Sequence, residues 1–180
     1  SDSALAWVTF RIPPDAATGE AVLTLDGQQL TTYNIQQTER IFEIPNVEID
    51  VHQEFPGVGT LIGVNIPQTE IVQGEDFPLE IIWQAGEESP LANYRVFGQL
   101  LSSDSVIWQS DSEPLSGQRP TSTWITGEYL VDSHLLHWNR LEYSGKATLI
   151  VGLYNPVTAE RISLPGGTTF VTIPAEIEVR

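Results

Sequence analysis

Cysteine is absent from the 180-residue chain, and this absence removes several chemistries at once. Disulfide bonds, thiolate nucleophiles and cysteine-based zinc sites are all excluded. Methionine is absent as well, so we expect that Ser1 is not a translation start and that the sequence is a piece of a longer protein. The lack of cysteine does not assign a compartment, because a cysteine-free chain folds in any of them.

Positive charge is scarce. Lys and Arg total 8 against 24 Asp and Glu, the formal net charge is -16, and Lys146 is the single lysine. Such a chain repels the phosphate backbone and anionic membrane surfaces, so we predict that neither nucleic acid nor a bare membrane is a partner. The acidic residues are scattered, which favours a surface that keeps molecules apart over a cation-binding patch.

Long apolar runs are missing too. No run approaches the roughly 18 residues of a membrane helix, so we expect any anchor or signal peptide to lie outside this sequence. Helical periodicity is nearly absent, apart from one possible short turn within 133–143. Hydrophobic residues nevertheless make up 41% of the chain, as in a folded globular protein.

The sequence is instead rich in short strand-like runs separated by Gly, Pro, Asn, Asp and Ser. Asp26-Gly27 between two such runs predicts a hairpin. Leu79, Ile81 and Trp83 alternate along one run and predict one buried face. The pattern predicts an all-β fold, an antiparallel β-sandwich of immunoglobulin-like or jelly-roll-like type, with a closed barrel as the alternative. The expected strands are 5–12, 20–25, 28–35, 40–44, 47–51, 60–66, 77–84, 94–101, 106–109, 129–137, 147–154, 161–164, 169–173 and 176–180.

Two pairs of segments are similar to each other at nearly equal offsets. Residues 18–25 resemble 144–151, and residues 44–51 resemble 173–179. A repeated unit explains both similarities. We therefore predict a partial β unit over residues 1–50, the tail of a degenerate repeat that packs on a complete sandwich domain over residues 51–180. Chance similarity between hairpins is the alternative.

The second half carries a series of short features whose order and spacing are more specific than any one of them. They are Gly74-Glu75-Asp76, Leu79 to Trp83, Asn93 to Phe97, Trp108 to Pro114, Pro120 to Trp124, Gly127-Glu128, Asp132, Gly152 to Pro156 and Glu160-Arg161. Together they resemble the β-sandwich region that follows the membrane part of some bacterial dolichyl-phosphate-mannose–protein mannosyltransferase-like glycosyltransferases. The resemblance covers residues 50–180 and departs from the family pattern at Phe97 to Leu100 and Ser144 to Ala147.

The resemblance implies an extracytoplasmic, bacterial accessory domain of a membrane-associated parent protein. It implies no catalytic residue here, because the transferase chemistry belongs to the membrane part. Its partner would be another domain of the same parent or a glycan.

Residues able to do chemistry are few. His134 and His137 are three apart, so on a strand they point to opposite faces, and His52 is expected in a solvated loop. The carboxylate pairs able to serve a hydrolase are Glu75–Asp76, Glu87–Glu88 and Asp111–Glu113, all in expected loops. Asp104, Asp111 and Glu113 are the only calcium candidates, without a recognised ligand spacing. We predict no catalytic residue, metal or cofactor.

Tryptophan offers the remaining candidates. Trp83 is expected in the core and Trp108 half-buried, whereas Trp124 and Trp138 lie outside clean strands. A carbohydrate-binding module would stack sugar on these two rings. The candidate ligand-binding residues are Trp124, Trp138, Asp111, Arg119 and Asp132. The alternative is structural, with Trp124 closing the core and the aspartates bracing loops. A non-catalytic accessory or interaction domain is the leading hypothesis, followed by a carbohydrate-binding module and then a hydrolase.

Overall fold

The computed structural model describes residues 19–35, 39–103, 105–139 and 141–180 of the chain, which divides into two units, Ser1–Glu39 and Arg40–Arg180. In the first unit, β1 (Gly19–Leu25) and β2 (Gln28–Ile35) pair antiparallel through a two-residue turn. Asp26 and Gly27 both have positive φ, as a type I′ turn requires. The predicted hairpin is thus confirmed, and the expected strand 5–12 lies outside the described residues.

The boundary between the units falls after Glu39, ahead of the expected position near residue 50. Residues 40–48 belong with the second unit because they hydrogen-bond to it. The Tyr129 amide donates to Ile41 O at 2.7 Å, and the Glu48 amide donates to Asn65 Oδ1 at 2.8 Å. The repeat hypothesis for residues 1–50 stays a prediction.

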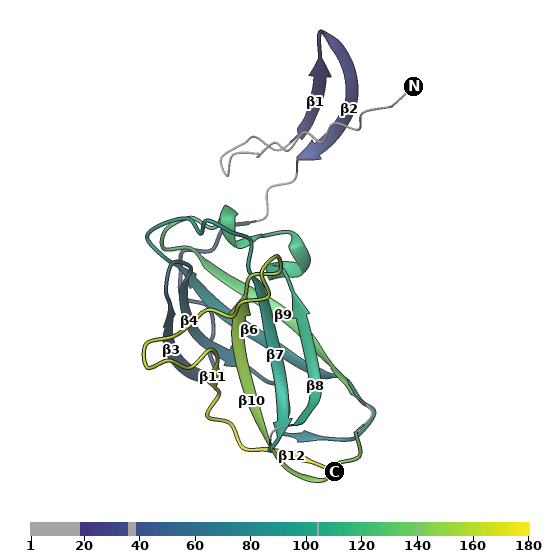
Figure 1. Ribbon diagram of the computed structural model, residues 1–180, viewed down its shortest axis with the longest axis vertical. Helices are drawn as coiled ribbons and strands as arrows, with labels where there is room; N and C mark the ends of the chain where they lie inside the picture. Colours follow the sequence, from purple (N-terminus) through teal and green to yellow (C-terminus); the bar gives the residue numbers. More distant parts are fainter. Residues whose placement is uncertain (1–18, 36–38, 104, 140) are drawn as a thin grey trace. The chain divides into compact units, whose positions relative to one another are not determined.

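The regular secondary structure of the second unit is almost all β-strand (Figure 1). Its described helical segments are two 3-10 turns, η1 (Pro114–Gly117) and η2 (Thr121–Thr123). Its strands are β3 (Ile49–Phe55), β4 (Gly59–Asn65), β5 (Glu70–Ile71), β6 (Phe77–Ala85), β7 (Arg95–Ser102), β8 (Ser105–Ser112), β9 (Tyr129–Trp138), β10 (Gly145–Tyr154), β11 (Val171–Thr172) and β12 (Ile177–Val179).

These strands form one curled, mixed sheet in the order β3-β4-β6-β9-β8-β7-β10-β12-β5, with β11 beside β10. The sheet curls where β9 changes partner along its length. β9 pairs with β6 over 129–136 and then with β8 at His137 and Trp138. β10 pairs with β7 on one edge and with β11 and β12 on the other. Figure 1 shows β6 and β9 crossing behind β7, β8 and β10. The β5–β12 pair is parallel, which corrects the expectation of a purely antiparallel sheet.

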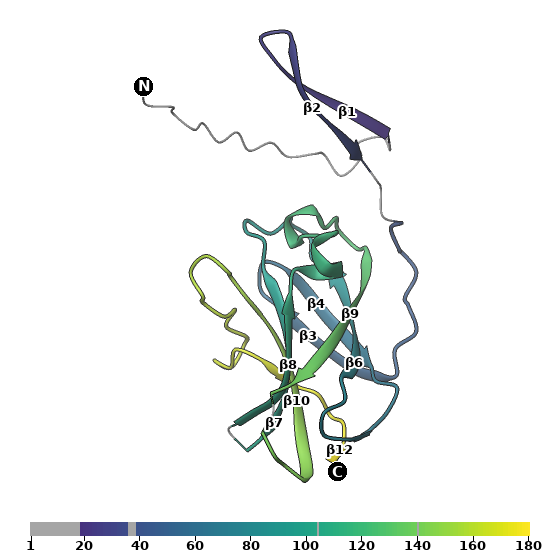
Figure 2. The same ribbon diagram turned by 90° about the vertical axis from the view of Figure 1, so that its right-hand side faces the viewer.

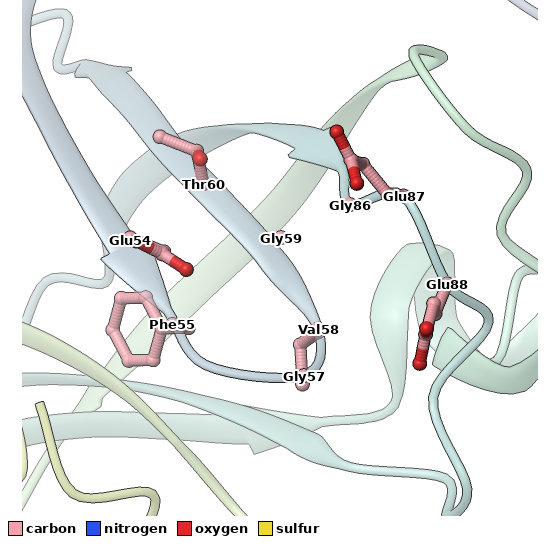
Figure 3. A pocket seen from close by; sticks show the side chains of 9 residues that line it. All are labelled: Glu54, Phe55, Gly57, Val58, Gly59, Thr60, Gly86, Glu87 and Glu88. Atoms are coloured by element: carbon pink, nitrogen blue, oxygen red, sulfur yellow. The ribbon is translucent and has the colours of Figure 1, made fainter.

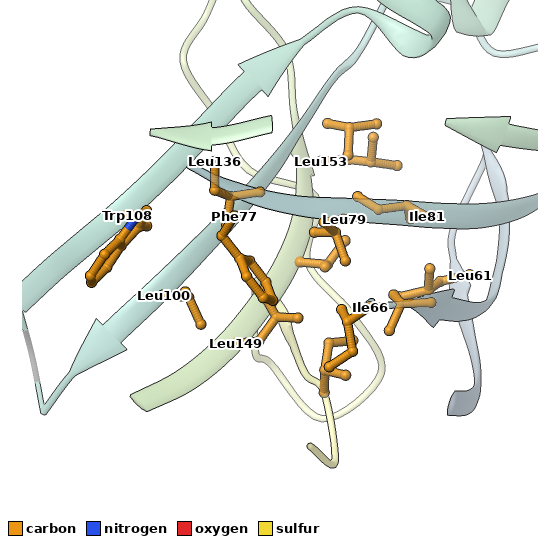
Figure 4. Packing of buried hydrophobic residues seen from close by; sticks show 14 of the residues in the cluster. Leu61, Ile66, Phe77, Leu79, Ile81, Leu100, Trp108, Leu136, Leu149 and Leu153 are labelled. Atoms are coloured by element: carbon orange, nitrogen blue, oxygen red, sulfur yellow. The ribbon is translucent and has the colours of Figure 1, made fainter. Parts of the chain in front are cut away.

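The core fills the space inside this curl (Figure 4). Leu79, Ile81 and Trp83 on β6 are at most 1% exposed, so the predicted alternation is confirmed. On β7, Gly98 faces the same core. A Cβ there would lie 3.0 Å from Leu79 Cδ2, so glycine lets the two strands approach closely. Trp108, expected to be half-buried, is fully buried, because β8 is part of the curl.

Several strand predictions needed correction. Residues 40–44 and 161–164 contribute only isolated bridges, Ile41 to Tyr129 and Arg161 to Tyr154. β8 extends beyond the expected 106–109 at both ends, and the segment 133–138 is strand rather than a helical turn. The two-residue strand β5 was not predicted, since two residues carry no alternation.

Candidate functional site

Trp124 lies in the core rather than on the surface. Its side chain is 1% exposed, and its ring lies 6.1 Å from that of Trp83, centroid to centroid. Its indole Nε1 donates to the Arg119 carbonyl oxygen at 3.0 Å. In this position the ring closes one end of the core and offers no face on which a sugar could stack.

A fully buried carboxylate, Glu128, holds the chain around Trp124. Its Oε1 accepts hydrogen bonds from the Arg119 guanidinium and from the Ile125 amide, and its Oε2 accepts one from Arg40 Nη1 at 2.7 Å. Two cations therefore neutralise one buried anion. Arg119, predicted to bind a ligand, is 5% exposed and serves this ion-pair network. Glu128 was not predicted as a site residue, because no local pattern links it to Arg40 at a separation of 88 residues.

Along β9, the inward-facing positions carry two polar residues among leucines. Asp132 and His134 pair with Ile81 and Leu79 of β6, and both side chains are fully buried. His134 Nε2 lies 2.8 Å from Asp132 Oδ2, and His134 Nδ1 lies 3.3 Å from the Ser110 hydroxyl on β8. A neutral ring protonated at Nε2 donates to Asp132 and accepts from Ser110, which satisfies both nitrogens. Ser110, His134 and Asp132 are thus linked in the same order as the nucleophile, the base and the orienting acid of a serine hydrolase.

These three residues lie where β8 and β9 diverge, and the η1 turn closes the opening beside them. The Leu115 amide donates to Asp132 Oδ1 at 2.8 Å. Leu115 and Ser116 both have positive φ, 51° and 53°, a conformation that costs energy for residues other than glycine. Asp132 therefore acts as the brace that the structural alternative described, holding a strained turn over an enclosed histidine.

The other two candidate residues lie elsewhere. Asp111 is on the outer face of the sheet, where it accepts a hydrogen bond from Tyr154 OH at 3.1 Å and lies 3.6 Å from Arg95 Nη1. The Tyr154 hydroxyl, followed by the charge of Asp111, raises the pKa of the Arg95 guanidinium. Trp138, at the far end of β9 from Glu128, is partly buried against Trp108. The five predicted ligand residues thus do not converge on one site.

The remaining histidines are exposed. His137 points away from the core, opposite to buried His134, as predicted, and its Nδ1 lies 2.8 Å from Asp76 Oδ1. His52 lies inside β3 at an irregularity, with φ of 55°, rather than in the expected loop. Within the described residues, no group of three His, Asp or Glu side chains is placed to hold a metal. The calcium hypothesis includes Asp104, which lies outside them.

An acidic recess of about 420 Å³ lies beside the β3–β4 turn. It contains Glu54, Glu87 and Glu88 around several glycines (Figure 3). Figure 3 shows the Glu87 and Glu88 carboxylates pointing away from each other. A glycosidase needs two carboxylates on either side of one scissile bond, and this pair does not provide that arrangement.

A second concave surface, here called the strap groove, is more varied in chemistry. It has a volume of about 450 Å³ and lies between residues 44–47 and the outer face of β3, β4, β6 and β9. Its lining combines apolar, amide, phenol, imidazole and carboxylate side chains: Ile44, Pro45, Asn46, Val47, Asp50, His52, Ile62, Gln84 and Tyr129. Sequence reasoning missed it, since its members come from five separate segments.

No helix in the described part of the chain is long and apolar enough to span a membrane. Comparison of the chain with family models, with curated proteins and with solved structures gave no match to any of them.

Proposed function

We propose that this chain is a non-catalytic binding module of a larger extracytoplasmic protein, and that its second unit is a β-sandwich. The core supports the sandwich assignment, because inward residues of β6 and β9 pack against inward residues of β7 and β10 around one hydrophobic cluster.

One observation carries the non-catalytic assignment. Of the three residues best suited to catalysis, His134 and Asp132 have fully buried side chains, and Ser110 is only partly exposed. A serine hydrolase must bring its substrate carbonyl to the serine and pass a proton through the imidazole. Here the imidazole is fully buried, and Asp132 is also committed to the Leu115 amide.

A serine-directed fluorophosphonate probe tests this assignment. We expect the folded 180-residue chain to show no more labelling of Ser110, by peptide mass spectrometry, than of an ordinary surface serine. The Ser112→Ala variant is a matched control, because Ser112 lies two residues further on the same strand. Rapid labelling of Ser110 that survives Ser112→Ala, and is lost in Ser110→Ala and His134→Ala, would replace the module by a hydrolase.

The family resemblance supports a parent protein of glycosyltransferase type, with this module on the outer side of a bacterial membrane. The sequence encoded upstream of residue 1 in the full-length gene tests that part. A run of membrane helices there is expected, and a parent without any membrane helix would contradict it.

A further inference from the structure

We infer that the strap groove binds a neutral oligosaccharide. The inference concerns a different surface from the predicted tryptophans and rests on the proposed binding-module function. Its volume of about 450 Å³ falls within the range of about 300–1,000 Å³ that small-molecule sites occupy.

The outer wall of the groove is fixed at both ends. At one end, the Tyr129 amide donates to Ile41 O. At the other end, Asn65 Nδ2 donates to Asn46 O at 3.1 Å, while Asn65 Oδ1 accepts from the Glu48 amide. Figure 2 shows this segment running outside the sheet before it turns into β3. A wall held in this way needs little ordering when a ligand binds, which favours affinity.

Gly63 on β4 lets residues 44–47, here called the strap, lie against the sheet. A Cβ at Gly63 would collide with Ile49 O and with Val47 Cγ1. Any other residue would push the strap off β4, so the close approach that forms the groove depends on this glycine.

The polar groups in the groove match the hydroxyls of a sugar. Gln84 Nε2 donates to Tyr129 OH at 3.0 Å, which leaves the Tyr129 hydroxyl proton and Gln84 Oε1 available to a ligand. The side chain of Asn46 is exposed and has no hydrogen-bond partner among the described residues. Each sugar hydroxyl both donates and accepts, so amides and a phenol recognise it better than groups with a single role.

Charge in the groove argues against an ionic ligand. No Lys or Arg lines it, and its one carboxylate, Asp50, lies 3.7 Å from His52 Nε2. The net charge of -16 also repels anions such as phosphates and uronates. Ile44, 71% exposed, adds an apolar rim that suits the C–H face of a pyranose ring.

Isothermal titration of the 180-residue chain with cello-, laminari-, xylo-, manno- and N-acetylated chitohexaose tests the inference, with oligogalacturonate and chitosan hexamers as charged probes. We expect at least one neutral hexasaccharide to bind, with the same affinity at low and high salt. In Gln84→Ala and Asn46→Ala we expect affinity to fall about 5-fold or more, since each removes hydrogen bonds to the ligand.

Matched controls lie on the outer face of the other half of the sheet. Gln99→Ala on β7 repeats the chemistry of Gln84→Ala away from the groove, and Tyr154→Phe on β10 removes a phenol hydroxyl there. Both are expected to leave affinity unchanged. Asn46→Ala should not disturb the fold, because Asn65 contacts the backbone carbonyl of residue 46 and not its side chain. A loss of affinity in this variant therefore reports on the ligand contact. The inference is overturned if no neutral probe binds, if only charged probes bind, or if Asn46→Ala and Gln84→Ala bind as the wild type does. None of these results would change the outcome of the fluorophosphonate test, which addresses the non-catalytic assignment separately.

Discussion

Arg40 Nη1 lies 2.7 Å from Glu128 Oε2, and this pair joins the first residue of the second unit to the start of β9. Because Glu128 is fully buried and also binds Arg119, one carboxylate fixes three separate segments. The contact also explains why the compact unit begins nine residues before the first strand of its sheet.

Replacement of Glu128 by glutamine keeps the side-chain shape but removes the negative charge between two guanidinium groups. Breaking a buried ion pair in this way costs about 3–5 kcal/mol, and we expect the free energy of unfolding in urea to fall by that amount. Glu142→Gln, at an exposed position, is the control and should change stability by less than about 0.5 kcal/mol. Equal stabilities of the two variants would show that the network contributes nothing.

Asp132→Ala should release the η1 turn. It leaves the Leu115 amide and the His134 ring without their acceptor, at a cost of about 1–3 kcal/mol for each buried group. Amide hydrogen exchange at Leu115 should become faster in this variant. Asp132→Asn retains an oxygen for the amide and should keep exchange slow, so fast exchange in both variants would argue against the brace.

Trp124→Ala should act on stability. Removing a buried tryptophan costs about 3–5 kcal/mol, and the neighbouring Trp83 loses its aromatic partner. Trp138→Ala, at a partly buried site, should cost less. Thermal unfolding of both variants provides the comparison, and a larger loss in Trp138→Ala would contradict the placement of Trp124 as the core closure.

Gly152→Ala should destabilise β10. Its added Cβ would collide with the Phe97 ring and approach Thr169 O at 3.0 Å. Overpacking of this kind costs about 1–3 kcal/mol. At Gly98, the nearest atom is the flexible end of Leu79, so Gly98→Ala should be tolerated better. Urea unfolding of the two variants tests this order, and the reverse order would be evidence against the close contact at Phe97.

The strands that could be predicted are those in which apolar and polar residues alternate along the sequence. β6 was recognisable because Leu79, Ile81 and Trp83 alternate with solvent-facing positions. β9 was also predicted, over 129–137, but the burial of Asp132 and His134 was not, since they occupy inward positions that a polarity pattern assigns to solvent. Their burial depends on partners such as Ser110, which lies 24 residues earlier in the chain. No local signal carries that information.

The candidate sites were less predictable than the fold for the same reason. Trp124 was correctly recognised as lying outside a strand, yet a position outside a strand does not distinguish surface from core. The strap groove depends on Gln84 and Tyr129 meeting across the β6–β9 pair, 45 residues apart. Such a juxtaposition follows only from the register of the sheet.

The change of partner along β9 also bears on how the chain reaches this structure. The β3–β4 and β7–β8 hairpins are local and can form early, but each is marginal alone. β6 gains its second neighbour only when β9 arrives from about 45 residues downstream, and the same strand then joins the two halves. Sheets dominated by such distant pairings fold over milliseconds to seconds. We therefore expect the placement of β9 to limit the folding rate, and the two halves to gain and lose structure together.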